Sequence, residues 1–400
     1  MAEGILRPAW AEIDLGALAA NVRLLREVCA PAALCAVVKA DGYGHGAVAV
    51  AKAAIEAGAT SLAVALVDEG IELREAGIAA PILVLSEPPI DAAEATLEHT
   101  LTSALYSDEL LAALERAALA LGGRATVHVK VDTGMHRVGL APAAVVDFVS
   151  ALDRSPNLTM EGFFTHLAVA DGDRAEDREF TGLQISRFEQ HLRDIGAHGI
   201  RPALRHAANS AGAIAYPASR FDLARVGIAL YGEPPSPFVG AALAAATGGR
   251  ALQPVLSLRA RVVALRRFEA GERPSYGRRR PLPASSWVAT VPIGYADGVV
   301  RRLFESGGEV LIGGRRRPLA GVVTMDQTVV DCGPEGDVSV GDEVVLIGRQ
   351  GDQSITAAEW ADRLGTIAYE VLTGIGPRVP RVVDDLARAE RRRGLAAVKP

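Results

Sequence analysis

The sequence predicts an α/β fold: an N-terminal (β/α)8 barrel of the TIM type followed by a smaller, mainly β domain. Three observations support this. Eight strand-like segments alternate with helical stretches up to residue 226. After residue 233 a Pro- and Ala-rich stretch leads into short strands and turns. The 400 residues, 49% of them hydrophobic, are enough for two cores.

Apolar runs bounded by turn residues mark the barrel strands. The expected strands are 34–39, 61–66, 81–85, 101–105, 126–132, 159–166, 202–207 and 221–226. The helical stretches between them include 45–57, 67–76, 107–121, 142–153, 176–198 and 209–216. A doubly wound sheet is the alternative, but eight units in about 230 residues favour the barrel.

The second domain follows a segment that we interpret as a linker, from Pro234 through an Ala/Gly stretch to Gly249. Its expected strands are 253–267, 286–293, 318–323, 327–331 and 343–347. We therefore divide the chain into an N-terminal strand (1–14) that packs with the β domain, the cofactor-binding barrel (15–240), the β domain (250–384) and a charged tail (385–400).

Composition argues against several function classes. The net charge of −6 gives no basic field for nucleic acid or an anionic membrane. No apolar run is long enough to span a bilayer, and residues 1–10 lack the apolar core of a signal peptide. Cys29, Cys35 and Cys332 lack zinc-ligand spacing and indicate cytosolic thiols. We expect a cytoplasmic protein without a metal.

Lys39 is the most informative residue of the chain. It ends the apolar run from Leu34 to Val38, and a glycine-rich turn with Tyr43 follows it. A partly desolvated amine at a strand end loses proton affinity and becomes a nucleophile toward carbonyls. From position alone, a surface lysine at a strand end is the alternative.

The strand 126–132 carries a polar row. Its valines share one face, whereas Thr126, His128, Lys130 and Asp132 share the other. If helices cover the valines, the polar row points into the barrel. An inward Lys130 must then be paired, neutral or chemically modified, and Asp132 or another acid is a possible partner.

Other polar residues fall near strand C-termini, where barrel enzymes build their sites. They are Arg137, His166, Asn209, Ser210 and Arg225. Taken singly, each also has a structural interpretation: a core histidine for His166, an ion pair with Asp222 or Glu233 for Arg225, and a helix N-cap for Asn209-Ser210. Their placement at one rim favours a shared site.

The last barrel strand suggests a phosphate site, because loops after strands 7 and 8 of such barrels often bind phosphate through backbone N–H groups. Gly227 permits close backbone approach there. A reactive lysine at strand 1 together with a phosphate site suggests a phosphorylated aldehyde cofactor, and pyridoxal 5'-phosphate satisfies both.

At these residues the chain closely resembles the bacterial alanine racemases, which are fold-type III pyridoxal-phosphate enzymes. The resemblance extends over nearly the whole chain. The matching segments are 10–15, 38–46, 130–137, 165–168, 208–210, 225–228, 275–277, 294–298, 325–327 and 364–370.

The resemblance implies the catalytic roles. Lys39 would carry the cofactor covalently and serve as one base, and Tyr276 would be the other base, supplied by the partner subunit of a homodimer. His166 would link Tyr276 to Arg225, which would face the pyridine nitrogen. Lys130 is a candidate for carbamylation that would orient Arg137.

The resemblance also implies the binding roles. Arg137 would contact the cofactor phenolic oxygen and the substrate carboxylate, which the backbone N–H of the partner's Met325 would also bind. Phosphate or other cofactor contacts would come from Tyr43, Asn209, Ser210, Gly227, Ile228 and Tyr369.

Asp171, Tyr295 and Arg301 match positions along a substrate access path. Two residues near it depart from the family pattern: Thr324 stands where a cysteine is common, and Ala368 where an asparagine is frequent. These departures bear on inhibitor sensitivity and substrate tuning more than on the reaction.

The implied function is pyridoxal-phosphate-dependent interconversion of L- and D-alanine by two bases, supplying D-alanine for peptidoglycan. The alternatives are a broad-specificity racemase of the same fold, a fold-type III decarboxylase and a non-catalytic pyridoxal-phosphate-binding protein. The first is typically exported, the second pairs the pyridine nitrogen with an acid, and the third consists of the barrel alone.

Overall fold

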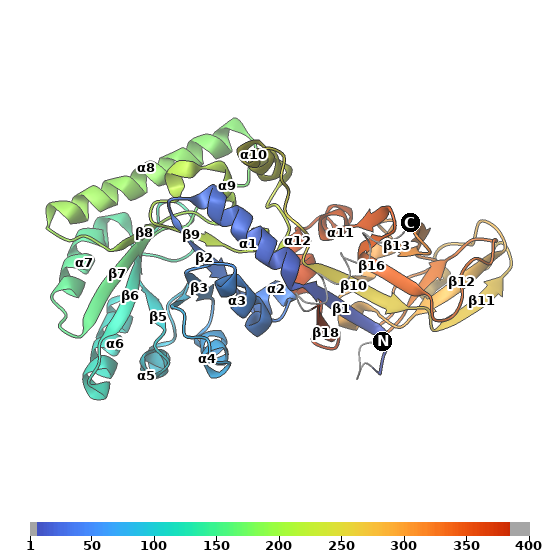
Figure 1. Cartoon of the computed structure of the whole chain (residues 1–400), viewed down its shortest axis with the longest axis horizontal. Coiled ribbons are helices and arrows are strands. Elements are labelled where there is room, and N and C mark those ends of the chain that lie inside the picture. Colours follow the sequence, from blue (N-terminus) through green and yellow to red (C-terminus); the bar gives the residue numbers. More distant parts are fainter. Residues whose placement is uncertain (1–5, 385–400) are drawn as a thin grey trace, which may run out of the picture. The chain divides into compact units, whose positions relative to one another are not determined.

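The computed structural model describes residues 6–384, so the predicted tail 385–400 lies outside the described residues, as do residues 1–5. The chain forms two compact units (Figure 1). The barrel unit contains Leu18–Gly42 and Ala47–Gln253. The C-terminal unit contains the residues up to Ala17, the short segment Tyr43–Gly46 and the chain from Pro254 onward.

Eight parallel strands form the sheet of the barrel unit, in the order β8-β7-β6-β5-β4-β3-β2-β9. Backbone hydrogen bonds from Asp222 N to Arg205 O (2.9 Å) and from Arg225 N to Ala208 O (3.1 Å) join its two ends, so the sheet nearly closes. The predicted barrel is therefore confirmed. Its strands are β2 (Ala33–Val37), β3 (Ser61–Val64), β4 (Ile82–Val84), β5 (Thr102–Leu105), β6 (Ala125–Lys130), β7 (Leu158–Phe164), β8 (Leu204–His206) and β9 (Leu223–Val226).

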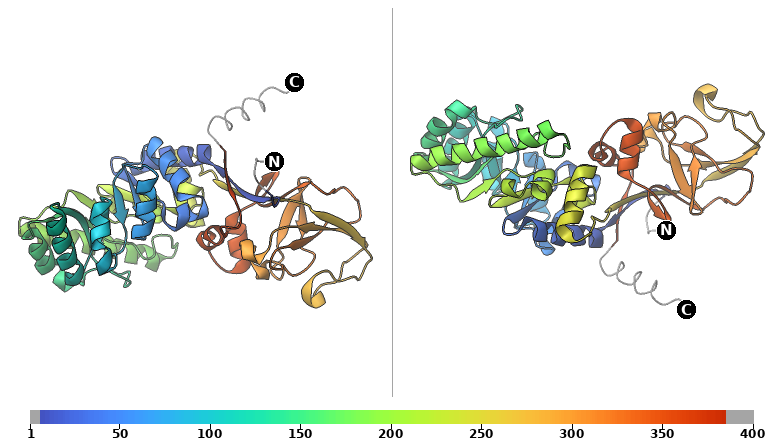
Figure 2. Two further views of the ribbon diagram at one scale, coloured as in Figure 1. Left: turned by 90° about the horizontal axis from the view of Figure 1, so that it is seen from below. Right: turned by 90° about the horizontal axis from the view of Figure 1, so that it is seen from above.

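Helices cover the outside of this sheet, and the long green α8 is plain in Figure 2. Three of them, α1, α5 and α10, were not predicted. The N-terminus of α1 is capped by Asp14, whose Oδ1 accepts a hydrogen bond from Ala17 N (2.8 Å). The helices are α1 (Leu15–Cys29), α3 (Ala47–Glu56), α4 (Val67–Glu75), α5 (Ala93–Glu98), α6 (Asp108–Leu121), α7 (Val145–Asp153), α8 (Ala175–Ala197), α9 (Ser210–Ala215) and α10 (Pro237–Thr247).

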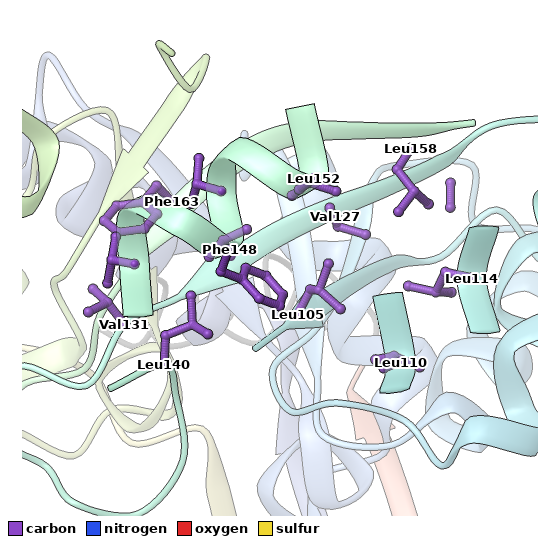
Figure 3. Close-up of a cluster of buried hydrophobic side chains, with 14 of the residues drawn as sticks. Leu105, Leu110, Leu114, Val127, Val131, Leu140, Phe148, Leu152, Leu158 and Phe163 are labelled. Carbon is purple, nitrogen blue, oxygen red and sulfur yellow. The ribbon is translucent and has the colours of Figure 1, made fainter. Parts of the chain in front are cut away.

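The valines of β6 face the helices, as the polar row predicts. Val127, Val129 and Val131 belong to a buried cluster with side chains of α6 and α7, among them Leu114 and Phe148 (Figure 3). Successive strand residues point to opposite faces, so the polar side chains of β6 point into the barrel. Inside, the His128 ring meets the Phe164 ring at a centroid distance of 6.5 Å.

Two antiparallel-rich sheets form the C-terminal unit. The larger has the order β14-β13-β16-β10-β1-β18, with β17 beside β16, and the smaller has the order β11-β12-β15. The strand β1 pairs antiparallel with β10 and parallel with β18. The strands are β1 (Ala9–Asp14), β10 (Leu256–Arg261), β11 (Ala264–Phe268), β12 (Ser286–Val291), β13 (Glu309–Ile312), β14 (Arg315–Pro318), β15 (Thr328–Asp331), β16 (Glu343–Gln350), β17 (Gln353–Ile355) and β18 (Arg381–Asp384).

The predicted linker is wrong, because α10 occupies most of it. The Ser236 hydroxyl accepts a hydrogen bond from Val239 N (3.3 Å), and Gly248 ends the helix in the left-handed region at φ 66°. Val239 and Leu243 are buried. A Ser N-cap, a proline in the first turn and a C-terminal glycine are helix signals that the Pro- and Ala-rich composition hid.

Further differences concern the C-terminal unit, where β13, β14, β17 and β18 were not predicted. The expected strand 253–267 is divided between β10 and β11, which lie in different sheets. Of the expected strand 318–323, Pro318 ends β14 and the other residues form a buried loop in which Leu319 makes an isolated bridge to Val330. The helices α11 (Ala357–Leu364) and α12 (Ala368–Thr373) were not predicted.

Candidate active site

Five basic side chains gather where the strands of the barrel unit end. Lys39 follows β2, Lys130 ends β6, Arg137 lies in the loop after it, His166 follows β7, and Arg225 is in β9. Each of Lys39, Arg137 and Arg225 acts electrostatically on Lys130. The side chains predicted to share one rim therefore lie close together, and we call them the basic cluster.

Burial and mutual repulsion lower the proton affinity of this cluster. The pKa of Lys130 falls to about 8, first because of burial and then because of Arg225 and Arg137. Burial and Arg137 also lower the pKa of Lys39. Burial and Arg225 hold the pKa of His166 well below its usual range. Such a site favours an anionic ligand and neutral amines.

Lys130 makes no ion pair with an acid in the part of the chain that the structure describes. Its Nζ lies 5.5 Å from the centroid of the Phe164 ring, which Arg225 also approaches at 5.2 Å. Asp132, the partner considered from the sequence, accepts hydrogen bonds from Gly134 N (2.9 Å) and pairs with His136 Nδ1 (3.1 Å). Because the Lys130 amine points inward without an acidic partner, we expect it to be neutral or chemically modified.

Two of the residues expected to bind phosphate, Ser210 and Gly227, are in direct contact. The Ser210 hydroxyl accepts a hydrogen bond from Gly227 N at 2.9 Å. Ile228 opens the adjacent 3-10 turn Ile228–Tyr231. Asn209 fulfils its structural interpretation, because its Oδ1 accepts from Gly212 N (2.9 Å) and caps α9. The Ser210 hydroxyl accepts the bond from Gly227 N and keeps its own proton, which it can donate to a phosphate oxygen.

The backbone after Lys39 is left-handed. The element α2 (Lys39–Gly44) has positive φ at Ala40 (52°), Asp41 (52°) and Tyr43 (54°), and its glycines do the same. Left-handed runs disfavour residues with a Cβ, and they persist where the surroundings enforce them. The sequence predicted only a glycine-rich turn here.

Glu69 supports this turn, a role that no sequence pattern indicated. Its carboxylate accepts hydrogen bonds from Ala40 N (2.6 Å), Ala65 N (2.8 Å) and Leu66 N (3.1 Å). One side chain on α4 therefore holds the ends of two neighbouring strands. It also raises the pKa of Lys39, against the larger lowering by burial and Arg137.

Arg225 donates hydrogen bonds to groups at the C-terminal ends of two strands, β7 and β8. Its Nη2 reaches the carbonyls of Thr165 (2.8 Å) and Ala207 (3.2 Å) and lies 3.3 Å from His166 Nδ1. Its Nη1 lies 2.7 Å from His206 Nδ1. Sequence reasoning missed His206, although it lies within the expected barrel strand 202–207. Neither Asp222 nor Glu233, the acids considered from the sequence, pairs with Arg225 among the described residues.

The remaining predicted residues belong to the C-terminal unit. The rings of Tyr43 and Tyr369 lie with centroids 6.2 Å apart. Tyr276 is 72% exposed and Met325 is 52% exposed. Met325 occupies a turn closed by Thr324, whose hydroxyl donates to Gln327 O (2.8 Å). The departure from the family pattern at Thr324 thus shapes the turn that carries Met325.

The residues of the expected access path are divided between the units. Asp171 is exposed in the barrel unit, and its carbonyl accepts a hydrogen bond from the Ser236 hydroxyl (2.7 Å). Tyr295 and Arg301 are exposed in the C-terminal unit, and Ala368 begins α12. Among the described residues, no helix combines the length and apolar character needed to cross a membrane.

Two family models match the chain: the alanine racemase N-terminal domain over residues 13–235 and the alanine racemase C-terminal domain over residues 255–383. The alanine racemase of Symbiobacterium thermophilum is 49% identical, with 94% of this chain and 97% of that protein covered.

Solved structures agree. The alanine racemase of Streptomyces coelicolor matches with a TM-score of 0.88 at 39% identity, covering 96% of this chain and 100% of that one. The histidine racemase of Leuconostoc mesenteroides matches with a TM-score of 0.83 at 29% identity, covering 95% and 99%. The chain therefore belongs to the alanine racemase family and is an amino-acid racemase.

Proposed function

We propose that this racemase interconverts L- and D-alanine with pyridoxal 5'-phosphate as cofactor and supplies D-alanine for peptidoglycan. The observation that carries the proposal is the basic cluster at the mouth of the barrel. Two lysines, two arginines and His166 lie within electrostatic reach of one another, with no acid paired to Lys130 among the described residues. This environment suits a cofactor with a phosphate, a phenolate and a substrate carboxylate.

The residues present fit the cofactor. Ser210 and the backbone N–H of Gly227, whose hydrogen bond is 2.9 Å long, would bind the phosphate together with Ile228 N, Tyr43 and Tyr369. Arg225 would donate to the pyridine nitrogen, and Arg137 to the phenolic oxygen and the substrate carboxylate. Lys39 would hold the cofactor covalently.

When bound, pyridoxal 5'-phosphate acts as an electron sink that acidifies the substrate Cα–H. Racemisation then requires a proton-accepting group on each face of the substrate. Lys39 would serve one face, and its lowered pKa places more of the amine in the neutral, proton-accepting form. Tyr276 would serve the other face.

A homodimer with shared sites would bring Tyr276 and the Met325 N–H to the barrel of the partner subunit. Their exposure supports this, because 72% of the Tyr276 surface is open to solvent in the single chain. A catalytic tyrosine needs a partly enclosed site to tune its proton affinity. A cytoplasmic location stays a prediction that cell fractionation can test.

The first experiment is a stereochemical assay. The purified protein should contain bound pyridoxal 5'-phosphate and convert L-alanine to an equal mixture of enantiomers, followed by optical rotation and chiral chromatography. Carbon dioxide release without racemisation would instead indicate a decarboxylase. Arg225 argues against that class, because its guanidinium cannot act as the acid partner of a pyridine nitrogen.

The second experiment tests the division of labour between the two bases. Tyr276→Phe should slow proton abstraction from L-alanine more than from D-alanine, because Tyr276 serves only one face. Deuterium isotope effects on Cα, measured in both directions, report this. Equal isotope-sensitive losses in both directions would contradict a face-specific tyrosine.

A racemase for another or a broader set of amino acids is the second candidate. The similarity to a histidine racemase at 29% identity supports this candidate, because the same architecture accepts substrates with different side chains. A panel of L-alanine, L-serine and L-histidine with chiral product analysis separates the candidates. Preference for L-histidine over L-alanine would overturn the proposed substrate.

A further inference from the structure

A chain of hydrogen bonds runs from Arg225 across the interior of the barrel unit to a side chain that reaches solvent. Arg225 Nη1 lies 2.7 Å from His206 Nδ1, and His206 Nε2 lies 2.9 Å from His128 Nδ1. His128 Nε2 lies 3.0 Å from Glu161 Oε2. Both imidazoles are buried, whereas 41% of the Glu161 side chain is exposed.

The two ends of this chain determine where its protons lie. A guanidinium only donates, so His206 must accept at Nδ1 and carry its proton on Nε2. His128 must then accept at Nδ1 and donate from Nε2, and an ionised carboxylate accepts that proton. Both imidazoles are therefore neutral Nε2–H tautomers, and every bond runs from Arg225 toward Glu161. The reverse order would place an N–H of His206 against an N–H of Arg225.

An irregularity between β6 and β7 leaves room for this row of hydrogen bonds. In the β6–β7 ladder, Val127 pairs with Met160 but His128 pairs with Gly162, so Glu161 is the extra residue of a bulge. Bulges redirect side chains and are found next to functional sites. A Cβ on Gly162 would lie 2.5 Å from His128 Nδ1, so only glycine leaves room for the ring there.

These hydrogen bonds also connect the buried guanidinium of Arg225 to the carboxylate of Glu161. Arg225 is buried beside Lys130 and has no carboxylate partner among the described residues. An unbalanced buried cation is costly, and polarisable hydrogen-bonded groups offset part of that cost. The His206 ring is fixed as well, because it stacks on Phe164 at 4.7 Å and 6°.

We propose that Glu161, acting through His128 and His206, is a positioning residue for Arg225. The inference rests on the proposed function, in which Arg225 faces the pyridine nitrogen. Glu161 accepts the Nε2 proton of His128 and so stabilises the order in which His206 accepts from Arg225, which fixes the guanidinium. Without this acceptor the buried Nε2–H of His128 has no partner, so the reverse order competes, and the N–H of His206 that then faces Nη1 makes Arg225 shift within the site.

The experiment compares two substitutions of similar size. Glu161→Met removes the acceptor oxygens, whereas Glu161→Gln keeps a neutral acceptor. Glu115→Gln is the matched control. Glu115 is also a carboxylate of the barrel unit and accepts a hydrogen bond from Asn157 (2.8 Å), but it takes no part in the hydrogen bonds between Arg225 and Glu161. If Glu161→Met does not fold, Glu161→Ala takes its place. Histidine ¹⁵N NMR of the holoenzyme reads the tautomers, and steady-state kinetics with L-alanine separate kcat from KM.

We expect Nε2–H tautomers at His128 and His206 in the unsubstituted enzyme, Glu161→Gln and Glu115→Gln. In Glu161→Met the tautomers should become mixed, and kcat should fall about fivefold with KM within about twofold, the size expected for one hydrogen bond. Unchanged tautomers in Glu161→Met overturn the proposal whatever happens to kcat, and so do mixed tautomers with unchanged kcat. Failure of the unsubstituted enzyme to bind pyridoxal 5'-phosphate would contradict the proposed function instead. The two failures are distinguishable, because cofactor binding is measured on the unsubstituted enzyme and the tautomers are measured without substrate.

Discussion

At the scale of single residues, the candidate site is marked by two lysine amines whose pKa values are lowered. Lys39 and Lys130 share a partly buried region with Arg137 and Arg225. Burial lowers the pKa of each lysine most, followed by Arg137 for Lys39 and by Arg225 and Arg137 for Lys130. Lys39 gains nucleophilicity and proton-accepting capacity from this environment. Lys130 has no proposed role as a base, so the lowered pKa matters for a different reason: it makes the amine available for chemical modification.

The state of Lys130 gives a testable prediction. With a pKa of about 8, roughly a quarter of its amines are neutral at pH 7.5, against about one in a thousand for a pKa of 10.5. Only the neutral amine reacts with carbon dioxide, so we expect a carbamate that is lost as the pH falls below 8. In bicarbonate-free buffer at pH 6.5, kcat should fall about tenfold as Arg137 loses a charged acceptor.

The measurement is ¹³C NMR of enzyme supplied with ¹³C-bicarbonate, together with turnover before and after bicarbonate is restored at a fixed pH. Lys130→Gln is the control, since its activity should not respond to bicarbonate. A free amine in the spectrum together with full activity in bicarbonate-free buffer would disprove the carbamate.

At the scale of elements, the left-handed α2 determines how Lys39 leaves its strand. The hydrogen bond from Gly42 N to Val38 O (2.8 Å) closes the turn around Lys39. Three residues with a Cβ adopt positive φ there, which costs about 1–2 kcal/mol each. The Glu69 hydrogen bonds offset part of this strain, so the turn and α4 act as one support.

Two glycines near the end of this segment test the support. Gly44 has φ +81°, and a Cβ there would lie 2.6 Å from Leu372 O; Gly46 has φ +95° with open space around it. Gly46→Ala should therefore lose only the backbone preference, about 1 kcal/mol of unfolding free energy. Gly44→Ala should lose about 2–3 kcal/mol, because the backbone must also move.

Thermal and urea unfolding of the holoenzyme rank these variants. Gly182→Ala, in α8 with open space around it, is the control and should stabilise the protein by about 0.5–1 kcal/mol. Equal losses at positions 44 and 46 would show that the Leu372 carbonyl does not constrain the turn.

At the scale of the whole molecule, the residues proposed to act in catalysis belong to two different units. Lys39 belongs to the barrel unit, and Tyr276 and Met325 belong to the C-terminal unit, where both are largely exposed. Exposed aromatic and thioether side chains are common at interfaces between subunits. A shared site in a homodimer would use them.

A mixing experiment distinguishes shared sites from sites within one chain. Lys39→Ala and Tyr276→Ala should each be inactive alone. Equal amounts, unfolded and refolded together, should recover about a quarter of the normal activity, because half of the dimers are mixed and each mixed dimer has one intact site of two. Each variant refolded alone is the control. No recovery, with mixed dimers present on native mass spectrometry, would contradict sharing.

Much of the site could be predicted from local patterns. The alternation in 126–132 predicted that Lys130 and His128 point inward, and the position of Lys39 after an apolar run placed it at the rim. Eight strand signals predicted the barrel, and the motifs around Lys39 and Met325 predicted the family. The helices α1, α5 and α10 were missed because alanine-rich stretches and the proline cluster carry weak periodicity.

The sequence alone thus determined the fold class, the family and the residue types of the site, because strand alternation and strand-end placement are local properties of the chain. Only the tertiary structure decided which of these residues touch. The bulge at Glu161 shifts the register of β7 by one residue, which aligns Glu161 and His128 with His206 from 45 positions further along. Register and barrel closure are set by packing between distant segments, and a one-residue shift moves a side chain to the opposite face.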